Sequence, residues 1–459
     1  MYQAGIVGEL LRLRKSRSPG GDPRAGSQDE QVARLPFFVA RNVLFLGLTS
    51  LVTDISSEMV STVLPLYLVY SLELSPLAFG VVDGLYQGGA AIARIIAGAF
   101  ADRWRRHKEL AGIGYALSAV CKLGFFAAGA SAPALTAVVV ADRTGKGIRG
   151  APRDALLSLS VPPSALATAF GVHRALDTAG ATLGPLAAFG LLALTPGRFD
   201  VIFALSFCVA TVGVALFALF VDAAPDPVPG PALEPAPPAP SEPHTAPLGD
   251  PDRPRANLWQ WRSPQFWMLV GFSAILGATT LSDGIVYLVL QRRMVLEARY
   301  LPLLFVAGSL VYALLAIPFG RLADRVGRWP VFLGGHVASI GLYALLWAAP
   351  PGRAAMVGCI VLFGASYAAT DGVLMAVASP MLPRAVRTTG LAAITTGSST
   401  GRLLASISFG ALWTRWGLEG ALASFAGALL VAVTLIAFSW SLGARSARNT
   451  RTPSPKELA

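Results

Sequence analysis

Long apolar segments alternate with short polar loops along almost the whole of this 459-residue chain. A helix needs about 20 consecutive apolar residues to cross the hydrocarbon core of a bilayer. Backbone groups in lipid must also pair within their own segment, so such segments form helices. The pattern predicts membrane-spanning helices at residues 42–70, 76–101, 109–130, 133–158, 165–195, 199–221, 264–291, 300–323, 330–350, 354–379, 386–414 and 418–442.

A Pro- and Ala-rich stretch at residues 222–263 interrupts this pattern. Its composition offers no apolar face for packing and is typical of an extended, disordered linker. The sequence therefore predicts an all-α membrane protein with a basic tail at 1–38, a six-helix bundle at 39–221, the linker at 222–263, a second six-helix bundle at 264–443 and a tail at 444–459.

Composition supports a membrane protein and excludes a nucleic-acid-binding one. Hydrophobic residues make up 54% of the chain and charged residues 14%, against about 25% charged residues in soluble domains. The net charge is +11, but most Lys and Arg lie in short loops rather than on one soluble face. The tails, the linker and the loops on their side hold roughly two dozen Lys and Arg, against about six on the other side. We therefore expect a multi-pass inner (plasma) membrane protein with both termini and the linker in the cytoplasm.

The chain carries no pattern that is typical of an enzyme or a metal site. Its three cysteines lie within apolar segments and behave as small hydrophobic residues. The phosphate-binding G-x-x-x-x-G-K-[ST] loop and the G-x-S-x-G and H-E-x-x-H patterns are absent from the sequence. We expect no catalytic residue, no metal and no cofactor. Without an ATP-binding loop, any energy that the protein uses must come from an ion gradient, most simply a proton gradient, or from the gradient of a molecule that it binds.

A charged loop motif, G-x-x-x-D-R, occurs twice, each time after a long apolar segment. The first copy comprises Gly98, Asp102, Arg103 and Arg106. The second comprises Gly320, Asp324, Arg325, Gly327 and Arg328. The first copy departs from the second, because Arg105 stands where the second has glycine. Two copies separated by nearly half the chain predict two versions of one helical bundle.

Each motif aspartate can act as part of a gate. A glycine at a helix end lets another helix approach closely. The aspartate can then lie at the N-terminus of a helix in the other half, where the helix dipole favours an anion by about 0.3–1 kcal/mol. We expect Asp102 to reach the start of the eleventh helix near Thr388 and Thr389. We expect Asp324 to reach the start of the fifth near Ser164 and Thr168. The alternative is that these charges only hold the loops at the lipid surface.

Two six-helix halves, a central linker and this loop motif after the second and eighth helices resemble the major facilitator superfamily. The resemblance covers about residues 39–443 and implies a transporter that works by alternating access around a midplane cavity. The segments D-x-S-S-E-M at 54–59 and D-R-x-G-K-G-x-R-x-x-P-R-D at 142–154 resemble a prokaryotic branch of uncharacterised substrate. We also note similarity to drug/metabolite:proton antiporters. The expected partners are the lipid bilayer, protons and a small-molecule substrate, and we expect a monomer.

A basic stripe follows one face of the fourth predicted helix and consists of Arg143, Lys146, Arg149 and Arg153. Charges at membrane depth are costly unless they face a cavity, water or carboxylates. We expect Asp142, Lys146 and Arg149 to line the substrate cavity, although Arg149 and Arg153 can alternatively reach the cytoplasmic interface. The segment also resembles the superfamily motif R-x-x-Q-G-x-G, which implies a role in proton coupling for Arg143.

Two acids share one face of the first predicted helix, because Asp54 and Glu58 are four residues apart. Near the midplane such acids must protonate, pair or bind a cation. We predict that Asp54 first, and Glu58 second, couples transport to protons. The alternative is a permanent ion pair with Arg143 or Lys146.

Other polar residues in the predicted helices complete the expected substrate cavity: Asp83, Gln87, Arg94, Asp283 and Asp371. A structural role for Asp83 near the outer surface stays open, and Arg94 needs an acidic partner such as Asp54 or Glu58. We expect Asp371 to face the basic stripe. In the fifth helix, Gly180, Gly184 and Pro185 resemble the G-x-x-x-G-P motif of drug:proton antiporters, where it packs against the other half.

Proton-coupled export of a small organic compound is the leading functional hypothesis. An alternative is transport of an organic anion, such as a carboxylate or a phosphate ester, with the basic stripe as its counter-charge. A second alternative is a membrane sensor or assembly factor that transports nothing. A stripe without acidic partners would favour the anion, whereas a fully paired stripe would favour the exporter.

Overall fold

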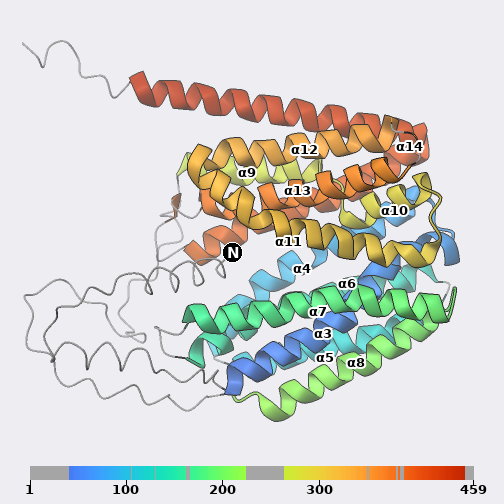
Figure 1. The fold of residues 1–459 in the computed structure, drawn as a ribbon. Helices are drawn as coiled ribbons and strands as arrows, with labels where there is room; N and C mark the ends of the chain where they lie inside the picture. Colours follow the sequence, from blue (N-terminus) through green and yellow to red (C-terminus); the bar gives the residue numbers. More distant parts are fainter. Residues whose placement is uncertain are drawn as a thin grey trace, which may run out of the picture.

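The computed structural model describes residues 41–104, 106–129, 131–161, 166–223, 263–348, 350, 352–378, 381–382 and 387–449. Only the backbone is described at 92, 94–104, 166–168, 372, 387–389 and 441–449. All regular structure in these residues is helical (Figure 1). The predicted tail 1–38 and almost all of the predicted linker lie outside the described residues.

The first half contains α3 (Arg41–Leu66), a π turn (Tyr67–Ser71), α4 (Pro76–Trp104), α5 (His107–Ala128), α6 (Ala132–Leu159), α7 (Leu166–Leu194) and α8 (Phe199–Phe220). The second half contains α9 (Pro264–Ala278), α10 (Asp283–Arg293), the short 3-10 helix η4 (Ala298–Tyr300), α11 (Leu301–Val326), α12 (Arg328–Ala348), α13 (Arg353–Ala378) and α14 (Arg387–Asn449). The described residues cross the bundle twelve times when α9 and α10 count as one crossing and α14 is divided at Gly417.

Three predicted spans differ in detail from the structure. The predicted span 264–291 is broken into α9 and α10, and the Ser282 hydroxyl caps α10 by accepting a hydrogen bond from the Ile285 amide at 3.2 Å. The predicted spans 386–414 and 418–442 form the single element α14, which turns at Gly417 with φ 73° and ψ 174°. That backbone conformation is essentially restricted to glycine.

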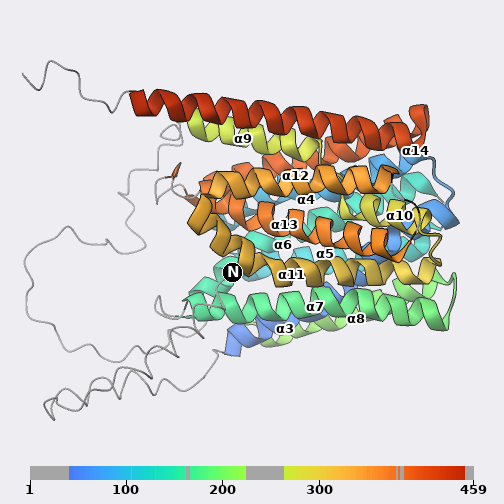
Figure 2. The same cartoon turned by 45° about the horizontal axis from the view of Figure 1, so that its top comes forward.

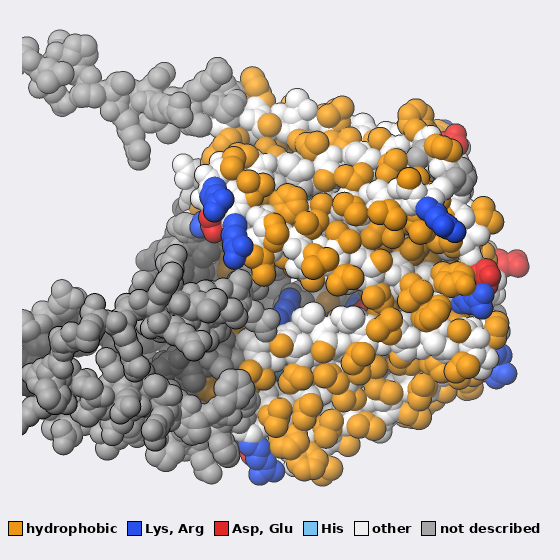
Figure 3. All heavy atoms as spheres, in the orientation of Figure 1, with side chains coloured by type: hydrophobic (Ala, Val, Ile, Leu, Met, Phe, Trp, Pro, Cys, Tyr) orange, Lys and Arg blue, Asp and Glu red, His pale blue; other side chains and the backbone are white. Residues whose placement is uncertain are grey.

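Nine of the described helical stretches are long and apolar enough to cross a membrane, by length and composition. The charged helix α6 is not among them, and neither is α4. Figure 3 shows hydrophobic side chains along the outer surface of the helices, with Lys, Arg, Asp and Glu near the two ends and in the hollow between the halves. This distribution fits a surface that faces lipid.

Helices of each half pack mainly on one another, and two helix pairs make most of the contacts between the halves. Within the first half α3 packs on α7 and α8, and α6 packs on α4 and α5, while in the second half α9 packs on α14 and α13 packs on α11 and α12 (Figure 2). Across the interface α4 packs on α14 and α7 on α11. Small residues permit the α4 crossing, since a Cβ on Gly84 would lie 2.7 Å from the Leu403 carbonyl oxygen.

The halves contact each other at one end of the bundle. We call the end at which α3 begins and α8 ends the linker end, and the opposite end the far end (Figure 1). At the far end, Tyr70 donates a hydrogen bond to Gln291 at 2.9 Å, and the rings of Phe189 and Tyr300 stack with centroids 6.2 Å apart. Toward the linker end, Figure 3 shows the surface hollowed between the halves.

Candidate functional site

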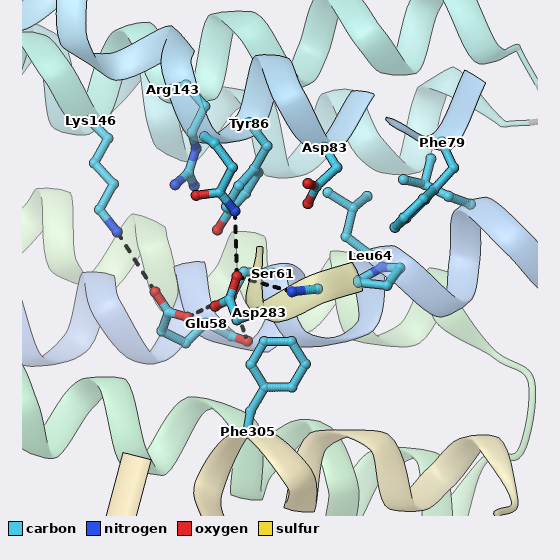
Figure 4. A pocket seen from close by; sticks show the side chains of 14 residues that line it. Glu58, Ser61, Leu64, Phe79, Asp83, Tyr86, Arg143, Lys146, Asp283 and Phe305 are labelled. Atoms are coloured by element: carbon cyan, nitrogen blue, oxygen red, sulfur yellow. Dashed lines mark hydrogen bonds and ion pairs between the residues drawn. The ribbon is translucent and has the colours of Figure 1, made fainter. Parts of the chain in front are cut away.

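A cavity of about 210 Å³ lies between the two halves, and we call it the central cavity (Figure 4). Helices α3, α4, α6, α10 and α11 all contribute to its wall. Its polar and aromatic lining residues are Glu58, Ser61, Phe79, Asp83, Tyr86, Gln87, Arg143, Lys146, Asp283 and Phe305. The sequence had predicted six of these charged and amide residues on four different helices, and the structure brings them to one place.

Glu58 and Lys146 form a loose ion pair on the cavity wall. The Lys146 Nζ atom lies 3.7 Å from Glu58 Oε1, and Ser61 donates a 2.6 Å hydrogen bond to Glu58 Oε2. The Lys146 side chain is 33% exposed and the Glu58 side chain 25%, so solvent in the cavity reaches both groups. Gly184 of α7 makes room for this part of α3, because a Cβ there would lie 2.7 Å from the Glu58 Cβ.

Arg143 faces the cavity from a buried cluster of charges. Its guanidinium donates to Asp142 Oδ2 at 2.6 Å and stacks on the Tyr86 ring, 4.0 Å from the ring centroid. Asp142 also accepts from Lys122 and from Ser118, each at 2.7 Å. Asp142 is buried behind Arg143 and does not line the central cavity, so its effect on a substrate would be indirect.

Lys122 is a functional candidate that the sequence reasoning missed. Its exposed fraction is 1%, and its neighbours along the sequence of α5 are mostly apolar. A single lysine inside an otherwise apolar predicted helix was the signal that could have revealed it, because a charge at that depth needs a partner. The partner, Asp142, is twenty residues away on the next helix.

Asp54 pairs with Arg149 in the interior of the first half. Arg149 donates to Asp54 Oδ1 at 3.1 Å and stacks on Tyr115 at 4.7 Å. Arg149 is buried and does not extend to a helix end, so the interface alternative for this residue is wrong. Neither Asp54 nor Arg149 lines the central cavity.

The last residue of the basic stripe, Arg153, is also paired. It lies 2.9 Å from Asp154 and 3.9 Å from Asp177, which accepts a 2.8 Å hydrogen bond from Ser50. All four basic residues of the stripe thus have a carboxylate within ion-pair distance.

Asp83 and Asp283 lie in the central cavity where the two halves meet. Ser406 of α14 donates a 2.5 Å hydrogen bond to Asp83, and Gln87 donates to Asp283 at 3.4 Å. Asp283 is the first residue of α10 and accepts from the Gly284 amide at 3.0 Å. The Ser406–Asp83 and Gln87–Asp283 hydrogen bonds each join the first half to the second. The side chain of Arg94 lies outside the described residues.

Asp371 lies in a different cavity from the basic stripe. It lines a second cavity, in the second half, together with Arg402. The central cavity, which holds Arg143 and Lys146, does not include it. The expectation that Asp371 faces the stripe therefore has no support in this geometry.

The glycines of the fifth helix pack within their own half, contrary to the implication of the resemblance. A Cβ on Gly184 would lie 2.8 Å from the Ile55 carbonyl oxygen of α3, and Gly180 lies against the backbone of Leu51, also in α3. Pro185 lies one residue further along α7. These small residues allow α3 and α7 to approach each other, and this approach sets the position of Glu58.

The second loop motif is described in full, and the first only in part. Gly327 ends α11 with φ 108°, a conformation that favours glycine, and Arg328 begins α12. The Asp324 side chain is 68% exposed and lies 4.0 Å from Arg328. Gly320 and Arg325 occupy the last turns of α11.

In the first motif only the backbone is described for Gly98, Asp102 and Arg103, and Arg106 is exposed before α5. The side chains expected to receive Asp102 and Asp324, those of Thr388 and Thr389 and of Ser164 and Thr168, also lie outside the described side chains. The gate therefore stays a prediction.

Comparison with known proteins gives consistent results. A sequence model described as Major Facilitator Superfamily matches residues 46–296 and 296–458. The chain is 30% identical over 384 residues to an uncharacterised MFS-type transporter of Methanocaldococcus jannaschii, covering 82% of this chain and 89% of the relative. It is 30% identical over 365 residues to an uncharacterised protein of Mycobacterium tuberculosis, covering 78% and 84%.

Solved structures share the fold at low sequence identity. The nucleoside transporter NupG superposes with a TM-score of 0.65 at 13% identity, covering 86% of this chain and 97% of NupG. A peptide transporter POT in complex with sulfate superposes with a TM-score of 0.69 at 14% identity, covering 90% and 98%.

Proposed function

Because the chain belongs to the major facilitator superfamily, a family of transporters, we propose that it exports a small organic compound in exchange for protons. The two halves would expose the central cavity to each side of the membrane in turn. In this proposal the protein lies in the cell's inner membrane with the linker end in the cytoplasm. That orientation follows from the Lys and Arg distribution.

The pairing of the basic stripe is the observation that carries this proposal. Each of its four cations has a carboxylate within 4.0 Å. A cation that already has a carboxylate partner is less available to hold an anionic substrate, although Arg143 shares its partner Asp142 with Lys122. The pairing therefore supports the exporter over an organic-anion transporter that uses α6.

Glu58 is the acid best placed to exchange protons with the cavity. It lines the cavity, it is partly exposed, and its ion pair with Lys146 is longer than the buried pairs nearby. Asp54, by contrast, is buried against Arg149 outside the cavity. A buried acid that is held by an arginine and has no contact with the cavity is poorly placed to load and unload a proton in each cycle.

Protonation of Glu58 would change the repulsion between the halves. Glu58 belongs to α3 of the first half, and it interacts electrostatically with Asp283 of α10 in the second half. Two like charges across the cavity disfavour closure around it. A proton on Glu58 removes that repulsion and so shifts the equilibrium between the two access states.

Proteoliposomes with an internal pH-sensitive dye test this proposal. We expect a subset of a panel of organic cations, anions and neutral compounds to trigger proton movement with the wild-type protein. Glu58→Gln should abolish gradient-driven transport but retain counterflow of the same compound, and Glu109→Gln, an exposed acid of α5, should behave as wild type. Full gradient-driven transport by Glu58→Gln would reject the coupling role. Absence of flux for every compound would favour a sensor.

A further inference from the structure

A second cavity, of about 130 Å³, lies within the second half of the protein. We call it the Arg402 cavity. Helices α9, α12, α13 and α14 form it, and most of its polar side chains are hydroxyls. The polar residues on its wall are Ser273, Thr280, His336, Thr370, Asp371, Thr395, Ser398, Ser399 and Arg402.

Arg402 differs from the four cations of α6 because it has no carboxylate partner among the described residues. Its one described hydrogen bond is donated to the neutral hydroxyl of Tyr367, at 3.1 Å, and its guanidinium lies 5.4 Å from the Tyr367 ring centroid. Asp371 lines the same cavity, but its carboxylate is not within the 4.0 Å ion-pair distance. Asp371 and Asp283 act on Arg402 electrostatically, but neither forms an ion pair with it. A half-buried cation at membrane depth is costly without a directly bound counter-charge, so a bound anion would be favoured there.

The surroundings of Arg402 suit an oxyanion. Arginine presents N–H groups in a planar fork that matches the two oxygens of a carboxylate or a phosphate. Ser398 and Ser399 precede it by one helical turn, so their hydroxyls share its face of α14. Gly401 lets this part of α14 pack closely on α9, since a Cβ at this position would lie 2.8 Å from the Ala278 backbone nitrogen.

The Arg402 cavity adjoins the central cavity through shared wall residues. A third, narrow cavity of about 70 Å³ lies between α4 and α14. It shares Gln87 with the central cavity, and it shares Thr395 and Ser399 with the Arg402 cavity. The three spaces therefore follow one another across the interface between the halves.

We propose that Arg402 is the anion subsite of this transporter and binds the carboxylate or phosphate group of the transported compound. The rest of the compound extends past Gln87 toward the central cavity. This inference rests on the proposed transport function and narrows its substrate to organic acids. It also places the counter-charge in α14 rather than in the paired stripe of α6.

Binding to the purified protein tests the subsite without any gradient. The probes are monocarboxylates, dicarboxylates and phosphate monoesters, each with its neutral amide or alcohol analogue, in a thermal-shift screen. We expect anions to raise the unfolding temperature where their neutral analogues do not. Arg402→Gln should weaken that binding about 10- to 100-fold, and Arg402→Lys should weaken it less. Arg353→Gln, an exposed arginine at the start of α13, should leave binding unchanged.

The outcomes separate this proposal from the transport proposal. Anion binding is measured without a gradient and proton coupling only with one, so failure of the subsite and failure of the coupling proposal give different results. Anion binding that is equally strong in Arg402→Gln would overturn the subsite, and so would stabilisation by neutral analogues alone. Inorganic phosphate and sulfate also enter the screen, and stabilisation by these alone would contradict an organic substrate.

A labelling experiment decides the case in which no probe stabilises the protein. Ser399→Cys is made in a chain whose three natural cysteines are replaced by alanine, and it is treated with a negatively and a positively charged methanethiosulfonate. The measured quantity is the ratio of the labelling rates by the negative and the positive reagent. We expect this ratio to be several-fold higher with Arg402 present than in the same chain with Arg402→Gln. An equal preference in the two chains would contradict an anion-attracting cavity.

Discussion

The Lys122 ammonium and the Asp142 carboxylate form a 2.7 Å ion pair in the interior of the first half, where their side chains are 1% and 3% exposed. Arg143 approaches the other carboxylate oxygen to 2.6 Å. One carboxylate therefore pairs with two cations, and the cluster keeps one positive charge. The cluster lies beside the central cavity, and Asp142 holds the Arg143 guanidinium on the cavity wall.

This charge count predicts an asymmetry between two substitutions. Asp142→Asn leaves two cations buried without a carboxylate and should lower the free energy of unfolding by about 3–5 kcal/mol. Lys122→Met should cost clearly less, because Arg143 and Ser118 still hold Asp142 and the net charge of the cluster falls to zero. Unfolding midpoints in detergent measure both. The control is Lys108→Met in the first turn of α5, where the ammonium donates only to the Ala218 carbonyl in the last turn of α8 among the described contacts. Equal losses for the two variants would show that the net charge does not dominate.

The crossing of α5 and α6 predicts an effect of glycine substitution. A Cβ on Gly114 would lie 2.7 Å from both the Arg149 nitrogen and the Gly145 carbonyl oxygen, and backbone atoms cannot move aside as a side chain can. Gly114→Ala should therefore destabilise the protein by about 1–3 kcal/mol. Gly171→Ala in α7 is the matched control, because nothing lies within 4 Å of its Cβ, and it should be neutral or slightly stabilising. Thermal unfolding of the two variants side by side gives the comparison.

The two acids of α3 should respond differently to loss of charge. Asp54→Asn leaves the buried Arg149 without its carboxylate, so we expect a lower unfolding temperature. Glu58→Gln affects a partly exposed, longer pair, so we expect little change in stability together with loss of proton coupling. Thermal unfolding and gradient-driven transport are measured on the same preparations. Wild-type stability with lost coupling in Asp54→Asn would instead assign the coupling acid to Asp54, as the sequence alone predicts.

The gate hypothesis makes a prediction for Asp324. In this structure its carboxylate is mostly exposed and lies 4.0 Å from Arg328, so Asp324→Asn should change stability by less than about 1 kcal/mol. If Asp324 closes the linker end in another state, the same variant should make a cysteine at Ser61 react faster with reagents added on the linker side. Asp200→Asn at the far end is the control, since its partner Arg198 is equally a surface residue. An unchanged reaction rate would remove the gate role.

Much of the candidate site could be predicted from sequence because its residues break an apolar pattern. Asp83, Lys146 and Asp283 are each a polar side chain within a predicted helix, and the structure places all three on the central cavity. The same reasoning placed Asp142 in the cavity wall, yet it lies behind Arg143. Helical periodicity gives the face of a residue, but the neighbouring helix decides whether that face meets a cavity or another side chain.

The amino-acid sequence by itself determined which segments form the long helices that cross the bundle and which positions within them carry a charge. These features follow from the length of apolar segments and from the 3.6-residue period, which are local properties of the chain. Only the tertiary structure decided which charge pairs with which. Arg149 meets Asp54 ninety-five residues away, whereas the one described hydrogen bond of Arg402 goes to the Tyr367 hydroxyl. Such pairings depend on how closely helices approach and how they are rotated, which small residues at each crossing set through packing.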